Sequence, residues 1–300
     1  THRVMHKHNP ILSIVIPSLH APLIGQVVAA LKAQTAYDQI HEIIIVGQDR
    51  HQLVPSGVTF MQTERPLSAA AARNLGARHA TGQILLFIDS DCVAAPDLVE
   101  RLLARHTEGH TIVGGSIAPG NDDYWMQCDH VLIFADFLPS THSGQRPFLP
   151  SGNCSIRRDL FLAMGGFDQQ FPGAAGEEVD LCLRLREQGH ALFFDANARV
   201  DHCHPRISAA TVWNHLRRFG QVQVTQWRRH PQLSQAPFGG RLRPFSGLLL
   251  ALSPLLSLWD VARTFAASPA LLAYVHLGPG MIWARMAWYW GITEALLAQP

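Results

Sequence analysis

The chain has 300 residues, more than a usual single domain, so its length predicts two domains or one large domain with an appendage. Hydrophobic residues make up 47% of the chain and charged residues only 16%, which allows a sizeable buried core. The formal net charge is +1, because 24 basic side chains nearly balance 23 acidic ones. This balance argues against a general polyanion-binding surface, and we expect no nucleic-acid partner.

The cysteines do not form a disulfide framework pattern. There are five of them, an odd number, and no two stand in a C-x-x-C spacing. Such usage is typical of a reducing compartment. The first ten residues also lack the apolar core of a secretory signal. We therefore expect a cytoplasmic location.

Short β-branched runs alternate with helical patterns through the first third of the chain. The runs predict strands over 11–17, 42–46, 58–62, 84–88 and 111–117. Helical spacing or helix-forming composition predicts helices over 22–34 and 68–80, and a further helix that Pro96 opens. The alternation predicts an α/β fold whose mostly parallel sheet is covered on both faces, with ligands beyond the carboxyl ends of its strands.

The remaining sequence is less regular and ends in apolar runs. We expect helices over 124–138, 176–190 and about 208–230, a turn, short strand and helix over 147–167, and two short strands over 191–195 and 198–204. The apolar runs 245–259 and 269–290 follow; the first is too short to span a bilayer, and Gly278-Pro279-Gly280 breaks the second. They predict helices at a membrane interface, or else a helical layer packed on the main domain or a partner subunit. We therefore divide the chain into a domain over 1–205 and a helical region over 206–300.

The stretch "LLFIDSDCVAAPD" (85–97) places two carboxylates at the end of a buried strand. In an extended segment Asp89 and Asp91 would point to the same side. Two neighbouring like charges repel unless a cation or a shared proton relieves them. A metal ion is therefore one explanation, and capping of a loop by Asp89 and of a helix by Asp91 is the alternative.

Six motifs occur in a fixed order along the first two thirds of the chain. They are "IVIPS", "EIIIV", "AARNLGARHATGQILLFIDSDC", "SGNCSIRRDLFLAMGGFD", "GEEVDLCLRLREQGH" and "HCHP", spread over residues 11 to about 205. In this order and spacing the set resembles the inverting family 2 glycosyltransferases of the GT-A fold. The resemblance implies a GT-A (Rossmann-like) domain that transfers a sugar from a nucleotide-diphosphate donor to an acceptor hydroxyl.

The resemblance also implies a donor and metal site. Asp89 and Asp91 match the family's D-x-D, so Mn²⁺ or Mg²⁺ is the expected cofactor, with Asp91 the more direct ligand and Asp89 nearer the ribose and donor sugar. A histidine after the last strand would reach the metal or diphosphate, here His202 or His204. The other donor-binding positions that the resemblance implies are Pro17, Ser18, Asp49, Arg73 and Ser90. Arg73 has a plainer alternative, an ordinary arginine on a helix surface.

"GEEVDL" matches the family's E-D-x-D-L, in which the second acidic residue is the general base. That position is Glu178, a glutamate where the family has aspartate, so either Glu178 is the base or Glu177 takes the role in a shifted register. A solvated or capping helix N-terminus is the plainer alternative. Asp180 would orient a neighbour such as Arg184. The positions that we expect near the transferred sugar or the acceptor are Gly152, Asn153 and Asp180.

The segment "DHCHP" (201–205) also raises the question of zinc. If it is extended, His202 and His204 share one side and Cys203 points away. A structural zinc site needs four ligands, and the sequence offers no others nearby. We therefore expect no structural zinc.

The expected activity is thus metal-dependent, inverting sugar transfer, with a UDP-sugar favoured over a GDP- or dTDP-sugar. The usual acidic pair after the second strand is replaced by Gly47-Gln48-Asp49, which leaves the nucleotide open. A catalytically silent scaffold that binds nucleotide or carbohydrate is the alternative, and a nucleotidyltransferase is a weaker one because "PSLHAPLIG" lacks a lysine-containing glycine-rich loop. The sequence names no acceptor, whether glycan, lipid-linked or peptide.

A basic helix before the apolar runs suggests where the acceptor lies. Its arginines would face an anionic cytoplasmic leaflet, and the apolar runs would enter the interface. We therefore expect peripheral membrane contact through 206–300, with a membrane-linked glycan or lipid as the acceptor. The arginines are Arg217, Arg218, Arg228 and Arg229.

Overall fold

The computed structural model describes residues 11–171, 175–230 and 244–298. The chain divides into two compact units. The first unit comprises Thr1–Ile117 and His142–Asp201, and the second comprises Ala118–Thr141 and His202–Pro300. Each unit is described by itself below.

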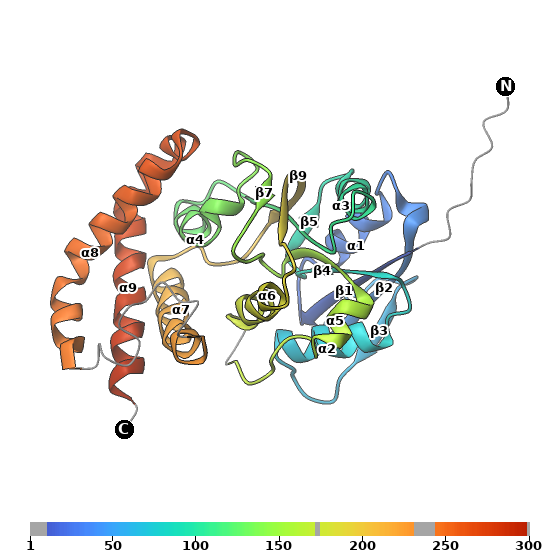
Figure 1. The fold of residues 1–300 in the computed structure, drawn as a ribbon, viewed down its shortest axis with the longest axis horizontal. Coiled ribbons are helices and arrows are strands. Elements are labelled where there is room, and N and C mark those ends of the chain that lie inside the picture. The colour runs from blue at the N-terminus through green and yellow to red at the C-terminus, as the bar shows by residue number, and fades with distance from the viewer. Residues whose placement is uncertain (1–10, 172–174, 231–243, 299–300) are drawn as a thin grey trace. The chain divides into compact units, whose positions relative to one another are not determined.

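A mixed sheet forms the centre of the first unit (Figure 1). Its strand order is β3-β2-β1-β4-β8-β6-β9-β5, and β7 pairs with β9. The strands are β1 Leu12–Leu19, β2 Ile40–Gln48, β3 Thr59–Gln62, β4 Ile84–Ile88, β5 Cys92–Ala94, β6 Ile112–Pro119, β7 Gly144–Gln145, β8 Asn153–Arg157 and β9 Phe193–His202.

Only one half of the sheet has the predicted parallel arrangement. β3, β2, β1 and β4 are parallel neighbours, whereas β8 runs antiparallel to both β4 and β6. The two short strands expected before residue 204 are a single strand, β9. The strand continues through Asp195, which is buried and pairs with Arg105 at 2.7 Å.

Helices cover both faces of the parallel half (Figure 1). On one face, the Gln34 side chain donates to the Ala95 carbonyl and accepts from the Val99 amide, which ties the C-terminal end of α1 to the start of α3. α3 begins at Leu98 after Pro96, which therefore precedes the helix instead of opening it. The helices of this unit are α1 Ile24–Lys32, η1 Tyr37–Gln39, α2 Ala69–His79, α3 Leu98–Thr107, α5 Arg158–Ala163 and α6 Glu177–Glu187.

Helix α2 packs tightly on the opposite face. Ser68 caps its start by accepting a hydrogen bond from the Ala71 amide at 3.2 Å. Gly76 allows the close approach, because a Cβ there would lie 2.5 Å from Cγ1 of Val15 in β1. This packing fixes α2 against β1 and β2, so its side chains are held near the carboxyl edge of these strands.

The second unit is helical. Helices α7 and α9 cross with their backbones in contact at two glycines: a Cβ on Gly220 would lie 2.0 Å from the Trp288 carbonyl oxygen, and one on Gly291 would lie 1.8 Å from that of Arg217. α9 starts at Gly278, so the predicted break at Gly278-Pro279-Gly280 is confirmed. The elements are α4 Tyr124–Phe134, η2 Ala135–Phe137, α7 Ala209–Arg229, α8 Ser246–Ala267, η4 Pro269–Leu277 and α9 Gly278–Leu297.

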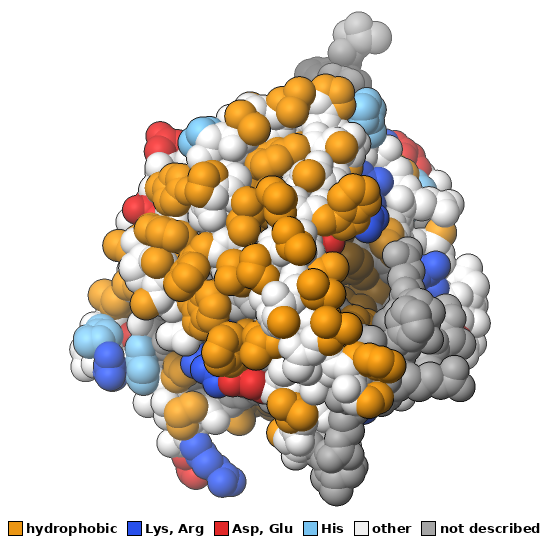
Figure 2. Space-filling view, turned by 90° about the vertical axis from the view of Figure 1, so that its left-hand side faces the viewer, with side chains coloured by type: hydrophobic (Ala, Val, Ile, Leu, Met, Phe, Trp, Pro, Cys, Tyr) orange, Lys and Arg blue, Asp and Glu red, His pale blue; other side chains and the backbone are white. Residues whose placement is uncertain are grey.

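Helix α8 is longer than its apolar run predicts. It has 22 residues, and it is the one helix among the described residues that is long and apolar enough to cross a membrane by length and composition. The expectation that this run is too short to span is therefore wrong. Only 17% of its most apolar stretch is buried. Figure 2 shows the hydrophobic side chains that gather on this face.

Candidate active site

A buried arginine joins two carboxylates in the first unit. Arg73, on α2, donates to Oδ1 of Asp89 at 2.5 Å and to Oε1 of Glu177 at 3.0 Å. The side chains of Arg73 and Glu177 are 3% and 1% exposed, and that of Asp89 is 31% exposed. The interpretation of Arg73 as a helix-surface arginine is therefore wrong. The arginine connects the carboxyl end of β4 to the first residue of α6.

The chain turns sharply after β4. The Cys92 amide donates to the Asp89 carbonyl at 3.0 Å, so Ser90 and Asp91 form the middle of a tight turn. The expectation of an extended segment is therefore wrong here. The rule that residues two apart in a strand point to the same side does not apply to Asp89 and Asp91. Asp91 is half-buried. Gly152 lies against the other side of Asp89, since a Cβ at this position would meet Oδ2 of Asp89 at 2.8 Å.

The start of α6 carries the predicted base. Gly176 caps the helix in the left-handed region, with φ of 93°, and its amide donates to Oε2 of Glu178 at 3.0 Å. The Glu178 side chain is half-buried. Loss of solvent and then the neighbouring Glu177 carboxylate raise the pKa of Glu178 to about 8. A carboxylate with such a pKa can accept a proton near neutral pH.

Other predicted donor residues lie at the ends of β1 and β2. Pro17 pairs with Val46 and Ser18 with Gly47, so these strand ends share one edge with the end of β4. Asp49 directly follows β2 and accepts a hydrogen bond from the Val54 amide at 2.7 Å.

Glycine is required at position 47 of this edge. Its φ is 144°, and a Cβ there would lie 1.7 Å from the Ser18 carbonyl oxygen. This close approach explains why no acidic residue stands at the position.

Two residues expected near the sugar or acceptor have structural partners. Asn153 is fully buried and donates to the Ser116 and Ala198 carbonyls at 3.0 and 2.9 Å. Asp180 pairs with Arg184 at 2.8 Å, as predicted for an orienting carboxylate. A role for Gly152, Asn153 or Asp180 near the acceptor stays a prediction.

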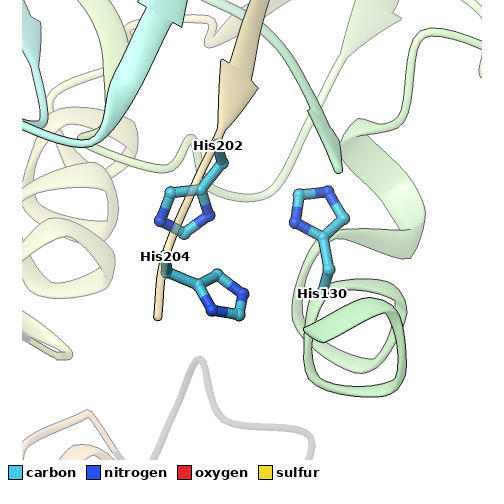
Figure 3. A group of neighbouring side chains, drawn as sticks. All are labelled: His130, His202 and His204. Carbon is cyan, nitrogen blue, oxygen red and sulfur yellow. The ribbon is translucent and has the colours of Figure 1, made fainter. Parts of the chain in front are cut away.

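The predicted histidines lie in the second unit. His202 and His204 share one side, with ring centroids 4.8 Å apart, and the Cys203 sulfur instead lies near the Gly120 carbonyl oxygen, as expected for an extended segment. Their role as ligands of a donor-bound metal stays a prediction. Sequence reasoning missed a third histidine beside them, His130 of α4 (Figure 3). A signal was available, because Asp129 and His130 stand in a helix whose other buried residues are apolar.

Asp129 organises the polar groups around this cluster. It is fully buried, accepts from Nδ1 of His215 at 2.6 Å and from Nε of Arg206 at 2.8 Å, and lies 3.4 Å from Nε2 of His204. Burial opposes its ionisation, but the His215 hydrogen bond and the nearby positive charges outweigh it and lower the pKa of Asp129 to about 2. Burial and the Arg206 charge lower the pKa of His204 to about 3, so its ring is neutral at ordinary pH.

The carboxylates at the end of β4 suit a hard divalent cation. Oxygen ligands are those that Mg²⁺ and Mn²⁺ prefer. Asp89 has one oxygen in the Arg73 ion pair, so Asp91 is the better placed to contribute a ligand without breaking that pair. The residues present therefore fit the expected metal. All five cysteines lie within the described ranges, and none of them forms a disulfide.

The sheet order and its acidic carboxyl edge define a GT-A glycosyltransferase domain, and the structural neighbours share this fold. The mannosyltransferase PcManGT from Pyrobaculum calidifontis, solved with GDP-Man and Mn²⁺, aligns with a TM-score of 0.61 at 19% identity, over 98% of this chain and 89% of that one. GalNAc-T7, solved with UDP, GalNAc and Mn²⁺, aligns with a TM-score of 0.54 at 19% identity, over 77% and 52%.

A family model described as "Glycosyltransferase like family 2" matches residues 8–220, and the chain belongs to this family. Two curated relatives are a glucosyl-dolichyl phosphate glucuronosyltransferase of Haloferax volcanii and a validoxylamine A glucosyltransferase of Streptomyces hygroscopicus. The first is 28% identical over 57% of this chain and 54% of its own length. The second is 24% identical over 76% of this chain and 70% of its own length. The chain thus spans about half the length of the first relative.

Proposed function

We propose that this glycosyltransferase is inverting and metal-dependent and uses a nucleotide-diphosphate sugar. The observation that carries the proposal is the junction at Arg73, which joins Asp89 at the end of β4 to the start of α6. This junction holds an acid of the donor-binding edge close to the first turn of α6, which carries the candidate base Glu178 beside Glu177. An inverting transfer needs both, because the base must take the acceptor proton on the side opposite the leaving diphosphate.

Glu178 is the base in this proposal, and Glu177 positions Arg73. Glu177 is 1% exposed and its Oε1 is bound to the arginine at 3.0 Å, so this oxygen is engaged in the ion pair and is not open to an acceptor hydroxyl. Glu178 has the raised pKa that a general base for the acceptor hydroxyl requires. These observations favour Glu178 over Glu177 in the proposal.

The donor and metal roles follow the edge of the sheet. Asp91 would be the main ligand of Mn²⁺ or Mg²⁺, and Asp89 would support it. A metal ion bound there would offset the negative charge of the diphosphate. Ser18 and Asp49 would line the nucleotide side. The neighbours solved with UDP and with GDP-Man make UDP- and GDP-sugars the donors to test first, with dTDP-sugars next.

Calorimetric titration of UDP, GDP and dTDP tests the donor site. With Mn²⁺ present we expect one nucleotide to bind at one site per chain, and EDTA or Asp91→Asn should abolish this binding. Asp159→Asn is the matched control, because this carboxylate is exposed and its hydrogen bonds are with its chain neighbours Arg157 and Leu160. Nucleotide binding that does not depend on the metal would contradict the role of Asp91 as a metal ligand. Metal-dependent binding without any sugar transfer would favour the catalytically silent scaffold.

We also propose that the second unit docks on a membrane. Leu248, Leu252, Leu255 and Trp259 form an exposed stripe along α8 at helical spacing, with Trp259 63% exposed. Such a stripe with an aromatic side chain suits the bilayer interface, and Figure 2 shows the hydrophobic side chains that gather on this face. One relative is named for a dolichyl phosphate substrate, which supports a lipid-linked acceptor. Arg217 is bound to Glu294 at 2.6 Å, so the apolar stripe carries this proposal more than the basic helix does.

Liposome flotation tests the docking surface. The double variant Leu255→Glu, Trp259→Glu should lower the membrane-bound fraction at least about tenfold, because two charges replace buried apolar area at the interface. Tyr37→Glu is the control, since Tyr37 is an exposed apolar side chain of the first unit. Equal flotation of all three proteins would refute the docking surface.

A further inference from the structure

The chain turns sharply after α5 in the first unit. Gly165 and Gly166 stand in the left-handed region, with φ of 76° and 72°, a conformation that favours glycine. Gly166 also lies against Asn74 of α2, since a Cβ at this position would be 2.5 Å from Oδ1 of Asn74. The turn is therefore shaped to fit closely against α2.

Asn74 binds both backbone groups of the next residue in the turn, Phe167. Its Nδ2 donates to the Phe167 carbonyl at 2.7 Å, and its Oδ1 accepts from the Phe167 amide at 2.9 Å. Asn74 is 4% exposed, so both hydrogen bonds lie away from bulk water. Because a side-chain amide offers a donor and an acceptor in one plane, this pairing fixes the Phe167 backbone against α2.

Arg184 of α6 binds the same turn. Its Nη1 donates to the Met164 carbonyl at 2.6 Å, and its Nη2 donates to the Gly166 carbonyl at 2.8 Å. Its Nε donates to Oδ2 of Asp180, four residues earlier on α6, at 2.9 Å. The helix is thereby attached to the turn that Asn74 holds, so Asn74 restrains α6 through this turn.

The Phe167 side chain extends this contact to the candidate site. The Arg73 guanidinium carbon lies 5.6 Å from the centroid of its ring, and the ring of Phe87 in β4 lies 5.2 Å from it. Arg73 and Asn74 are consecutive residues of α2, and Arg73 itself binds Glu177 at 3.0 Å. Helix α2 thus reaches α6 by two routes, an ion pair at the first residue of α6 and hydrogen bonds through the turn.

We propose that Asn74 is a positioning residue for the sugar transfer: by fixing the turn at Phe167 it sets where α6 presents the Glu178 carboxylate. The inference rests on the proposed function, in which Glu178 is the base. A base must lie within hydrogen-bond reach of the acceptor hydroxyl. A misplacement of about 1 Å can lower a rate about 100-fold. Asn74 acts through the turn and α6, without touching the donor or the acceptor.

Reaction of the full chain with the UDP-, GDP- or dTDP-sugar whose nucleotide binds in the titration tests this role. Asn74→Ala should lower kcat by about 10- to 100-fold, because the base is misplaced. The affinity for the nucleotide diphosphate should stay within about threefold, because the lost step is made in the transition state. If the affinity falls by the same factor as kcat, the positioning role is overturned.

Gln34→Ala is the matched control. Gln34 is also a buried side-chain amide, 5% exposed, and it joins the Ala95 carbonyl and the Val99 amide at 2.7 and 3.0 Å on the opposite face of the sheet. This variant should lose stability in urea as Asn74→Ala does, but it should keep the kcat of the wild type. Equal kcat in the two variants would overturn the proposal.

A second background shows whether Asn74 acts through Glu178. In Glu178→Gln the base is already lost, so adding Asn74→Ala should change the single-turnover rate, measured with enzyme in excess, by less than about twofold. A purely structural effect would lower the rate by the same factor in both backgrounds, which would overturn the proposal and leave Glu178 as the base. If Glu178→Gln alone turns over like the wild type, the proposed base is itself wrong and this inference falls with it.

A second pair of variants covers a failure of Asn74→Ala to fold. Asn74→Asp and Gln34→Glu keep the size of each side chain and its accepting oxygen, and each exchanges the donating amide for a carboxylate oxygen. The same comparisons of kcat, nucleotide affinity and the Glu178→Gln background then decide the proposal.

Discussion

Glu178→Gln is expected to lower sugar turnover by about 10²- to 10⁴-fold, because glutamine cannot take the proton of the acceptor hydroxyl. The substitution keeps the size of the side chain and an oxygen that can accept from the Gly176 amide at 3.0 Å. Donor affinity should therefore change little. Turnover of the nucleotide-sugar, with the titration of nucleotide diphosphate beside it, separates the two quantities.

The control for this variant lies on the same helix. Glu187→Gln, at an exposed position near the end of α6, should turn over like the wild type. A folded Glu178→Gln protein with wild-type turnover would show that the base lies elsewhere.

The pH dependence of the reaction should follow the same group. Because the pKa of Glu178 is raised to about 8, the base is protonated at acidic pH, and kcat/KM should rise with pH until about 8. The folded chain holds this proton more tightly than the unfolded chain. The stability that it contributes is therefore complete below about pH 4.5 and is lost as pH rises through 8. A rate profile that is flat between pH 6 and pH 9 would contradict the assignment.

Arg73→Met is expected to lower the free energy of unfolding by about 3–5 kcal/mol, because it leaves two carboxylates without their buried partner. Glu177 is almost fully buried and Asp89 is 31% exposed, so water can replace the arginine only in part. Urea unfolding measures the change. The same variant should also lose nucleotide binding, since Asp89 loses the contact that holds one of its oxygens.

Arg157→Met is the control for the buried network. Arg157 forms an ion pair with Asp159 at 2.6 Å, but both side chains are more than half exposed. Exposed pairs contribute little to stability, so this variant should unfold like the wild type. A similar effect of both arginine variants would contradict a special role for the buried network.

The sequence predicts most elements of the first unit, because burial of one face of a helix or strand leaves a regular spacing of apolar residues in the sequence. The wholly buried β4 follows a continuous apolar run, and α2 follows from its composition and its Ser68 cap. Strand direction leaves no such signal. β8 lies antiparallel between β4 and β6, and nothing in its alternation of side chains distinguishes that orientation from a parallel one.

The contacts of the candidate site join residues that are far apart in the sequence, so the sequence alone could not predict them. Arg73 and Glu177 are 104 residues apart, so their ion pair is invisible to any local pattern. The length of α8 was underestimated for a related reason. Asp260 ends the apolar run, but it accepts hydrogen bonds from Arg285 and Tyr289 at 2.9 and 2.7 Å, and this pairing allows the helix to continue.

The anomeric configuration of the released sugar tests the proposed mechanism most directly. Proton NMR can follow the reaction of α-linked UDP- and GDP-sugars with water when diamagnetic Mg²⁺ is the metal and enough enzyme is used to release sugar faster than its anomers interconvert. A one-step displacement assisted by Glu178 predicts that the β-anomer forms first and that Glu178→Gln suppresses it. Initial formation of the α-anomer, or the same rate in the variant, would contradict the account.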